Sequence, residues 1–171
     1  MFIDKRILYI VLGLFIVSNL AGLLSNTNAL LSLLISLPAV LIAITFHEYA
    51  HAWAADRLGD DTPRRQGRLS LNPFSHLDPI GTVMLVFAGF GWGKPVEIDS
   101  RNFNRNIKMS VAEAIVAAAG PLMNFILAII FTIIYTAIWK FAPSFVLTQV
   151  GSIVMILLSA CVSINVGLGV F

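Results

Sequence analysis

Two histidines and a glutamate, His47, Glu48 and His51, come directly after a stretch from Ile7 to Phe46 that carries no charge. Residues four apart lie on one face of an α-helix, so His47 and His51 can present both imidazoles to one metal ion. Neutral imidazole binds Zn²⁺ at about 2.0–2.1 Å and leaves a position for water, whose pKa the ion lowers to about 7. A carboxylate within hydrogen-bond reach can take the proton as water attacks a carbonyl. The spacing therefore predicts His47 and His51 as metal ligands and Glu48 as general base.

A pattern with three fixed positions also occurs by chance, and a His or Glu near the end of a membrane span can simply meet the interface. An ionisable residue at the middle of a spanning helix, however, costs roughly 2.5–3.5 kcal/mol on insertion scales, and such residues are by default functional candidates. Here three of them fall within five positions. The pattern favours a functional site.

The elements that must position these residues are membrane helices. The chain has 171 residues, of which 58% are hydrophobic and 12% charged, whereas soluble domains carry roughly 25% charged residues. A bilayer crossing needs about 20 apolar residues. The sequence predicts an all-α polytopic membrane protein with about four transmembrane helices, near Ile7–Leu24, Ala29–Trp53, Glu113–Trp139 and Leu147–Phe171. A cleaved signal peptide is the alternative for the first segment, but the run is long and lacks a clear cleavage site.

The segment Pro79–Gly93, between the second and third spans, is too short for a comfortable crossing and rich in glycine. We expect a re-entrant or β-hairpin segment there, with short strands in "GRLSL" and "KPVEI" on either side. Irregular backbone at membrane depth must be surrounded by protein or line a cavity, so a cavity is expected beside it. The whole chain, 1–171, is read as one membrane-embedded domain.

The distribution of basic residues predicts the topology. Ten of the eleven Lys and Arg lie before the first span or in the two loops between the second and third spans, and only Lys140 follows the third. The positive-inside rule then places the N-terminus and both basic loops in the cytoplasm.

Four motifs, "HEYAHAWAADRLGDD", "GRLSLNPFSHLDPIGT", "FGWGKPVEI" and "AAAGPLMNF", together resemble the compact bacterial branch of the site-2 protease family. The likeness runs from about Ala39 to the C-terminus. Members of this family are zinc metalloproteases that cut transmembrane segments inside the bilayer, and this branch has no PDZ domain. The resemblance implies Zn²⁺ as cofactor, a transmembrane protein as substrate, the lipid bilayer as surroundings, a multi-pass position in the cell (inner or plasma) membrane and no nucleic-acid partner.

The resemblance also implies a third zinc ligand, an aspartate in an Asn-x-x-Pro-x-x-Pro-x-Asp-Gly type motif on a later helix. The sequence ends in "INVGLGVF" at Phe171, where that motif is expected to begin, so we expect the domain to be incomplete at its C-terminus. Asp78 and His76 are the available substitutes. Asp before Pro commonly starts a turn, and a His in a polar loop is more often solvated.

Further residues in the matching motifs are candidates for substrate binding or for support of the zinc ligands: Asn72, Asp78 and Asn124. A carboxamide at Asn124 could hold a substrate carbonyl or a ligand, and interhelical hydrogen bonding is an equal alternative; Asn165 carries the same ambiguity. Gly120 permits close helix approach. Phe90, Trp92 and Phe103 are interpreted as markers of the membrane interface, and Cys161 as a packing residue.

Two functions of different classes remain open. The first is intramembrane proteolysis by zinc-activated water with Glu48 as base. The second is a non-catalytic membrane protein that binds metal or scaffolds a partner, which the missing third ligand makes credible. Two imidazoles combined with oxygen ligands suit zinc, but by ligand type they would also accept cobalt or iron.

Overall fold

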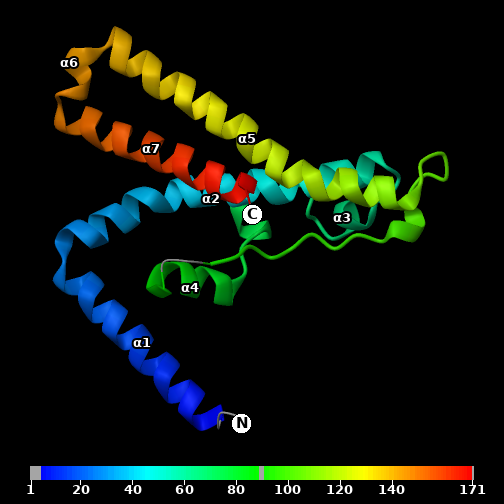
Figure 1. Ribbon diagram of the computed structural model, residues 1–171, viewed down its shortest axis with the longest axis horizontal. Coiled ribbons are helices and arrows are strands. Elements are labelled where there is room, and N and C mark those ends of the chain that lie inside the picture. Colours follow the sequence, from blue (N-terminus) through cyan, green and yellow to red (C-terminus); the bar gives the residue numbers. More distant parts are fainter. Residues whose placement is uncertain (1–4, 89–90, 171) are drawn as a thin grey trace.

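The chain is built of helices, the longest of which lie side by side over part of their length (Figure 1). The structure is a computed structural model that describes residues 5–88 and 91–170. Its α-helices and 3₁₀ turns are, in chain order, α1 (Lys5–Ser25), α2 (Thr27–Arg57), α3 (Thr62–Arg65), η1 (Pro73–Ser75), α4 (Pro79–Ala88), η2 (Ser100–Asn102), α5 (Met109–Phe141), α6 (Pro143–Val146) and α7 (Gln149–Val170).

Among the residues that the structure describes, three helices are long and apolar enough to cross a membrane, over Leu30–Arg57, Met109–Phe141 and Gln149–Val170. They correspond to the last three predicted spans and confirm a helical membrane protein. The first predicted span lies within α1, and its crossing of the bilayer stays a prediction. The chain breaks at Asn26, between α1 and α2, where the Asn26 side chain accepts a hydrogen bond from the Asn28 amide.

Helices α2, α5 and α7 pack against one another and form the centre of the bundle. In Figure 1, α5 and α7 run side by side in opposite directions and are joined by α6, while α1 diverges from them. The buried face of α2 is made almost entirely of alanine: Ala39, Ala43, Ala50, Ala52, Ala54 and Ala55. Small side chains let helices approach closely in a membrane, where van der Waals packing drives association.

The polar end of α2 is anchored to the segment that precedes α5. Gly59 has a φ of +109°, and a Cβ there would lie 3.0 Å from Asn104 Oδ1. The left-handed conformation that ends helices favours glycine. The Asn104 amide donates to the Leu58 carbonyl, and Phe103 is buried in a cluster with four residues of α2 and α5: Ala54, Ala55, Ala112 and Val116. Phe103 is therefore a core residue, and its interpretation as an interface marker is wrong.

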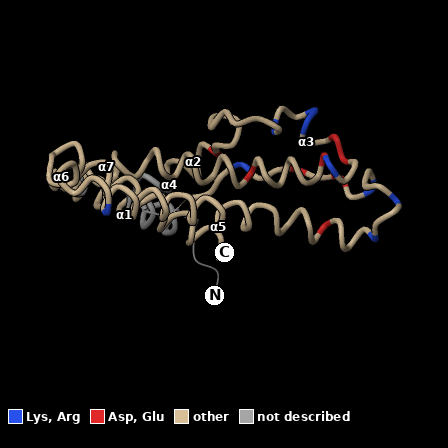
Figure 2. Tube along the Cα trace, turned by 90° about the horizontal axis from the view of Figure 1, so that it is seen from above, with Lys and Arg blue, Asp and Glu red and all other residues tan. Residues whose placement is uncertain are grey.

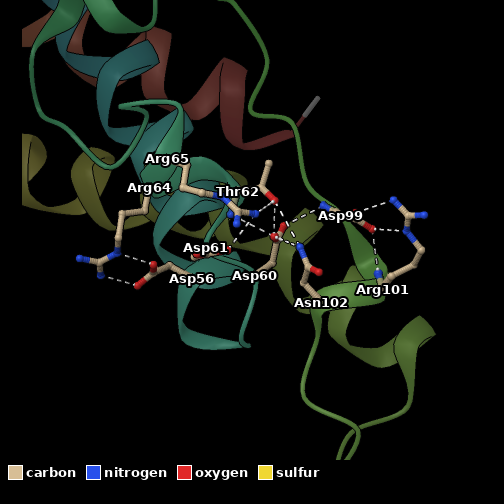
Figure 3. A network of polar contacts seen from close by, with 9 residues as sticks. All are labelled: Asp56, Asp60, Asp61, Thr62, Arg64, Arg65, Asp99, Arg101 and Asn102. Atoms are coloured by element: carbon tan, nitrogen blue, oxygen red, sulfur yellow. Dashed lines mark hydrogen bonds and ion pairs between the residues drawn. The ribbon is translucent and has the colours of Figure 1, made fainter.

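Asp60 is fully buried and accepts hydrogen bonds from both sides of this junction (Figure 3). Its Oδ1 accepts from the Thr62 amide and from Asn102 Nδ2, both at 3.0 Å, and its Oδ2 accepts from the Asp99 amide at 2.7 Å. Burial opposes ionisation of this carboxyl, but the hydrogen bonds from Asn102, Thr62 and Asp99 outweigh it and lower the pKa of Asp60. Asp60 thus holds the 94–108 segment against the end of α2.

These contacts bear on the predicted topology. Charged residues gather at the end of the bundle that carries α3 (Figure 2). The loop that follows α2 is hydrogen-bonded to the 94–108 segment through Asp60 and through Gln66 Nε2, which donates to Glu97 at 2.8 Å. Two segments in direct contact are expected on the same side of a bilayer, which predicts that the intervening chain makes no net crossing. That this side is the cytoplasm stays a prediction.

The expectation of short strands in "GRLSL" and "KPVEI" is wrong. The described part of the chain contains one isolated antiparallel bridge, between Leu77 and Gly93, and no strand. Backbone groups that a strand ladder would pair are bonded to side chains instead: His76 donates to the Ser70 carbonyl and Arg68 donates to the Pro95 carbonyl. Pro95 also lacks the N–H that a ladder requires.

A β-hairpin in the intervening segment is likewise wrong, because Pro79–Ala88 is the helix α4. Asp78 Oδ1 caps its start by accepting from the Gly81 amide. Ten helical residues reach about 15 Å, half of a hydrocarbon core of about 30 Å. A re-entrant position of α4 in the bilayer stays a prediction, and Gly89 and Phe90 lie outside the described residues.

Cysteines introduced at the exposed positions Gln66 and Asn106 should be labelled from the same side of the membrane, because their segments are bonded to each other. Leu147, 87% exposed at the opposite end of α5, supplies a control that should be labelled from the other side. The measurement is labelling with a membrane-impermeant maleimide in intact cells and inverted vesicles, with Cys161 replaced. Opposite sidedness of positions 66 and 106 contradicts this fold.

Asp60→Ala should loosen the 94–108 segment, because buried donors left without an acceptor cost about 1–3 kcal/mol. Limited trypsin cleavage after Arg101 and Arg105 should then be faster than in the wild type. Asp61→Ala is the matched control: Asp61 is exposed and its carboxylate makes a surface ion pair with Arg65, which contributes little. Equal cleavage rates in the two variants would show that Asp60 does not hold the segment.

Candidate metal centre

His47 and His51 lie one turn apart on α2 with their imidazoles turned toward each other. The ring centroids are 4.7 Å apart at an interplanar angle of 78°, and the two Nε2 atoms are 3.0 Å apart. The structure thus brings together the two side chains that the sequence pairs by their spacing. The backbone of α2 alone accounts for this, because residues i and i+4 share a helical face.

Each imidazole is oriented by a partner on α5 through its other ring nitrogen. His51 Nδ1 donates to the Val116 carbonyl at 2.7 Å, and His47 Nδ1 donates to Asn124 Oδ1 at 2.9 Å. Metal-ligating histidines almost always donate their second ring N–H to a carbonyl or carboxylate in this way. Both Nε2 atoms are consequently left with a lone pair.

The geometry of the two lone pairs fits a metal ion. Two nitrogens that each lie about 2.0–2.1 Å from a tetrahedral zinc ion are roughly 3.3 Å apart, close to the 3.0 Å between the two Nε2 atoms. Space for the ion exists because residue 120 is glycine. A Cβ on Gly120 would lie 2.3 Å from His51 Nε2 and 2.7 Å from His47 Nε2. The two histidines therefore fit as two ligands of one metal ion.

Glu48 lies beside the imidazoles and is held by a backbone amide. Its Oε2 accepts from the Val96 N–H at 3.1 Å. Glu48 and His47 line a cavity of about 220 Å³ together with Ile44, Gly91, Trp92, Gly93 and Leu168. The cavity expected beside the Pro79–Gly93 segment is thus present, and Trp92 lines it instead of only marking an interface.

The segment that carries Val96 is fixed by several side chains outside the bundle. Arg68, only 4% exposed, bonds the Ser75 and Pro95 carbonyls, and the Lys94 amide donates to the His76 carbonyl at 2.8 Å. Val96 therefore meets Glu48 at a defined position. The role of Arg68 was not anticipated from the sequence, where it is one basic residue among several.

Three other residues singled out in the sequence, Asn72, Asp78 and His76, are not brought to the histidine pair. Asn72 caps η1 by accepting from the Phe74 amide at 3.1 Å, and Asp78 caps α4. His76 is fully buried, so its interpretation as a solvated residue is wrong. Its Nε2 donates to the Ser70 carbonyl, and burial lowers the pKa of His76, with nearby Arg68 adding to the effect and the Ser70 hydrogen bond opposing it.

No third ligand joins the pair within the part of the chain that the structure describes, where no group of three His, Cys, Asp or Glu side chains could hold a metal ion. Asn124 does reach the site, where it bonds His47, and it also bonds Asn165 on α7. The sequence predicted only close helix packing at Gly120, and the space that this glycine leaves beside both Nε2 atoms was not predicted. Its place between the alanines of the motif and Pro121 could have indicated a close approach to another helix.

Apolar helices of spanning length, one of which carries two histidines with facing Nε2 atoms, define a helical membrane protein with a candidate metal site. The chain belongs to peptidase family M50, the site-2 protease family, whose model matches residues 35–169. Three curated relatives are each named as a putative zinc metalloprotease: YwhC of Bacillus subtilis (48% identical over 53% of this chain), Rip2 of Mycolicibacterium smegmatis (31% over 58%) and PM1991 of Pasteurella multocida (34% over 57%).

These matches cover only part of each relative. The aligned region spans 40% of the length of YwhC, 39% of Rip2 and 24% of PM1991. No solved structure matches the chain significantly.

Gly120→Ala should remove the metal site while leaving the helices intact, because the added carbon would overlap the space beside both Nε2 atoms. The zinc content of the purified protein should fall to a small fraction of the wild-type value. Gly167→Ala is the matched control, since nothing lies within 4 Å of a Cβ added on that spanning helix. Undiminished zinc in the Gly120 variant would place the ion elsewhere.

Proposed function

We propose that this protein is an intramembrane zinc metalloprotease that hydrolyses peptide bonds in transmembrane segments of other membrane proteins, and that it is a multi-pass protein of the cell membrane. Membership of family M50 supports the proposal. The observation that carries it is the pair of imidazoles with facing Nε2 atoms on an apolar helix of spanning length, beside a carboxylate and a cavity.

His47 and His51 are the proposed zinc ligands, each through Nε2. When bound, zinc supplies Lewis acidity that polarises a water molecule and the carbonyl of the scissile bond. The contacts to Val116 and Asn124 orient the two rings for this role. Catalytic zinc usually has three protein ligands, and no third His, Cys, Asp or Glu ligand joins the pair among the residues that the structure describes.

Glu48 is the proposed general base. The Val96 N–H binds its Oε2, which leaves Oε1 as the oxygen that accepts a proton from the attacking water. Oε1 lies 3.5 Å from the place of a Cβ on Gly93, on the side of the segment that lines the cavity. The same carboxyl then donates its proton to the amide nitrogen as the C–N bond breaks, so protons balance over the reaction.

The substrate must reach this site as extended chain. In a transmembrane helix every carbonyl is hydrogen-bonded within the helix, and the helix is about 10–12 Å wide with its side chains. A cavity of about 220 Å³ is too small for it. Gly91 and Gly93 leave its wall without side chains at two positions, which suits the close approach of an unwound backbone.

A non-catalytic membrane protein that binds metal or scaffolds a partner is the second candidate. It is favoured by the absence of a third ligand among the residues that the structure describes. Zinc binding without cleavage in the complete protein would support this candidate over the protease.

Glu48→Gln in the complete protein should reduce cleavage of a model single-span substrate at least about 100-fold, because general-base catalysis contributes roughly 10²–10⁴-fold. Zinc content should stay at the wild-type level, since both imidazoles remain. His47→Ala and His51→Ala should instead lose zinc together with activity.

Glu97→Gln is the conservative control, because Glu97 is exposed and bonds only Gln66. It should cleave at the wild-type rate. Wild-type cleavage by the Glu48 variant, measured with the same substrate in detergent or liposomes, would exclude Glu48 as the base.

A further inference from the structure

Two carboxamides connect His47 to α7 in the middle of the bundle. Asn124 on α5 and Asn165 on α7 are both completely buried, and Asn124 Nδ2 donates to Asn165 Oδ1 at 3.1 Å. We infer that Asn165 is a positioning residue for the proposed metal ligand His47, and that it acts through Asn124 to keep the proton of His47 on Nδ1 and the lone pair on Nε2. The inference rests on the proposed zinc site.

The direction of these hydrogen bonds is set at the α7 end. Asn165 Nδ2 donates to the Cys161 carbonyl, one turn earlier on α7, at 2.8 Å. A backbone carbonyl can only accept, so the amide of Asn165 has one allowed orientation. The reverse orientation would bring two acceptor oxygens together, and a buried unsatisfied polar group costs about 1–3 kcal/mol. Oδ1 of Asn165 must therefore face Asn124.

The fixed orientation of Asn165 then determines that of Asn124. An acceptor at Asn165 Oδ1 requires a donor opposite it, which is Asn124 Nδ2. Asn124 Oδ1 is consequently the atom that faces His47 Nδ1, at 2.9 Å. Because that oxygen can only accept, His47 carries its proton on Nδ1, and Nε2 is free to bind a metal. A carboxamide without this support can present either end to an imidazole.

His51 provides a contrast within the same site. Its Nδ1 donates directly to the Val116 carbonyl, which cannot reverse because it belongs to the backbone of α5. The protonation of His51 thus depends on the packing of α2 against α5 alone. That of His47 depends in addition on α7, through one side chain.

The test measures the protonation of the imidazoles directly. The chain has three histidines, so ¹⁵N-histidine labelling of the metal-free protein in micelles gives few signals, and ring-nitrogen shifts distinguish the Nδ1–H from the Nε2–H form. Asn165→Leu keeps a similar volume but removes the acceptor for Asn124 Nδ2. We expect a substantial fraction of His47 to change to the Nε2–H form, while His51 and His76, which are held by backbone carbonyls, keep the wild-type signals.

Zinc affinity gives a second readout. Replacing groups that orient a metal ligand typically lowers the affinity for the metal about 10–100-fold. Because Asn165 acts on His47 only through Asn124, we expect a loss of about 10-fold in zinc affinity, measured by competition with a chelator. Asn165→Ser covers the case in which the leucine variant does not fold. Its hydroxyl can bond the carbonyl of its own helix but is too short to reach Asn124, so the same change at His47 is expected.

Ser163→Ala is the matched control, two residues away on the same helix and exposed; it should change neither His47 nor zinc affinity. An unchanged His47 signal in both Asn165 variants overturns the inference, as does an equal change at His51. The proton readout needs neither zinc nor a substrate, so failure of the proposed protease function in the Glu48 experiment is distinguishable from failure of this inference.

Discussion

The close approach of α5 to the histidine face of α2 is the contact on which the rest of the site depends. Val116, Gly120 and Asn124 are spaced four apart and share one face of α5. His51 pairs with Val116 and His47 with Asn124, as expected for two helices that run in opposite directions. Between these pairs, Gly120 leaves the space that both Nε2 atoms face. One helical face thus supplies two acceptors and one gap.

The interior of the bundle obliges each of these polar groups to find a protein partner. Without water at membrane depth, an unpaired donor or acceptor costs several kcal/mol. Asn124 and Asn165 meet this requirement through each other, through His47 and through the Cys161 carbonyl. Cys161 itself is buried, in agreement with its interpretation as a packing residue. The hydrogen bonds that connect α2, α5 and α7 therefore also restrict the position of α7 relative to α5.

At the polar end, side chains rather than a β-ladder form the hydrogen bonds that hold the 94–99 segment in place. The 94–99 segment is bound by the Glu48 carboxylate at Val96, by Arg68 at Pro95 and by the Asp60 carboxylate at Asp99. Arg68 and Asp60 are buried or nearly so. Their bonds to the segment position the Val96 amide that orients Glu48. In the proposed site, Glu48 is thus positioned by residues outside the bundle, whereas His47 and His51 are positioned by residues inside it.

Hydropathy and helical periodicity were sufficient to predict much of this arrangement. The spans near Ala29–Trp53 and Glu113–Trp139 follow from composition, and the convergence of His47 with His51 follows from spacing. Both signals are local in the chain. The alternation in "GRLSL" was also local but misleading, because the Ser70 carbonyl there accepts from the His76 side chain and the Arg68 amide donates to the Pro63 carbonyl, rather than to a neighbouring strand.

The parts that could not be predicted depend on which helix faces touch. A single sequence does not reveal that Gly120 of α5 lies opposite His47 and His51 of α2, nor that His76 in a polar loop is buried. The same applies to Asn165, whose partner is 41 residues away. Such pairings arise only when the helices pack, so a pattern confined to one helix carries no information on them.

If the facing imidazoles bind a metal ion as proposed, metal binding is linked to the packing of the bundle. Their Nδ1 partners leave two lone pairs 3.0 Å apart, an arrangement that is repulsive in a low-dielectric interior unless a cation or a proton lies between them. Loss of either Nδ1 partner would relieve this repulsion by letting one ring turn or exchange its proton. The packing of α5 and α7 therefore keeps His47 and His51 in a conformation that favours a metal ion, and a bound ion in turn favours that packing, because binding energy realised only in the folded site is also folding energy.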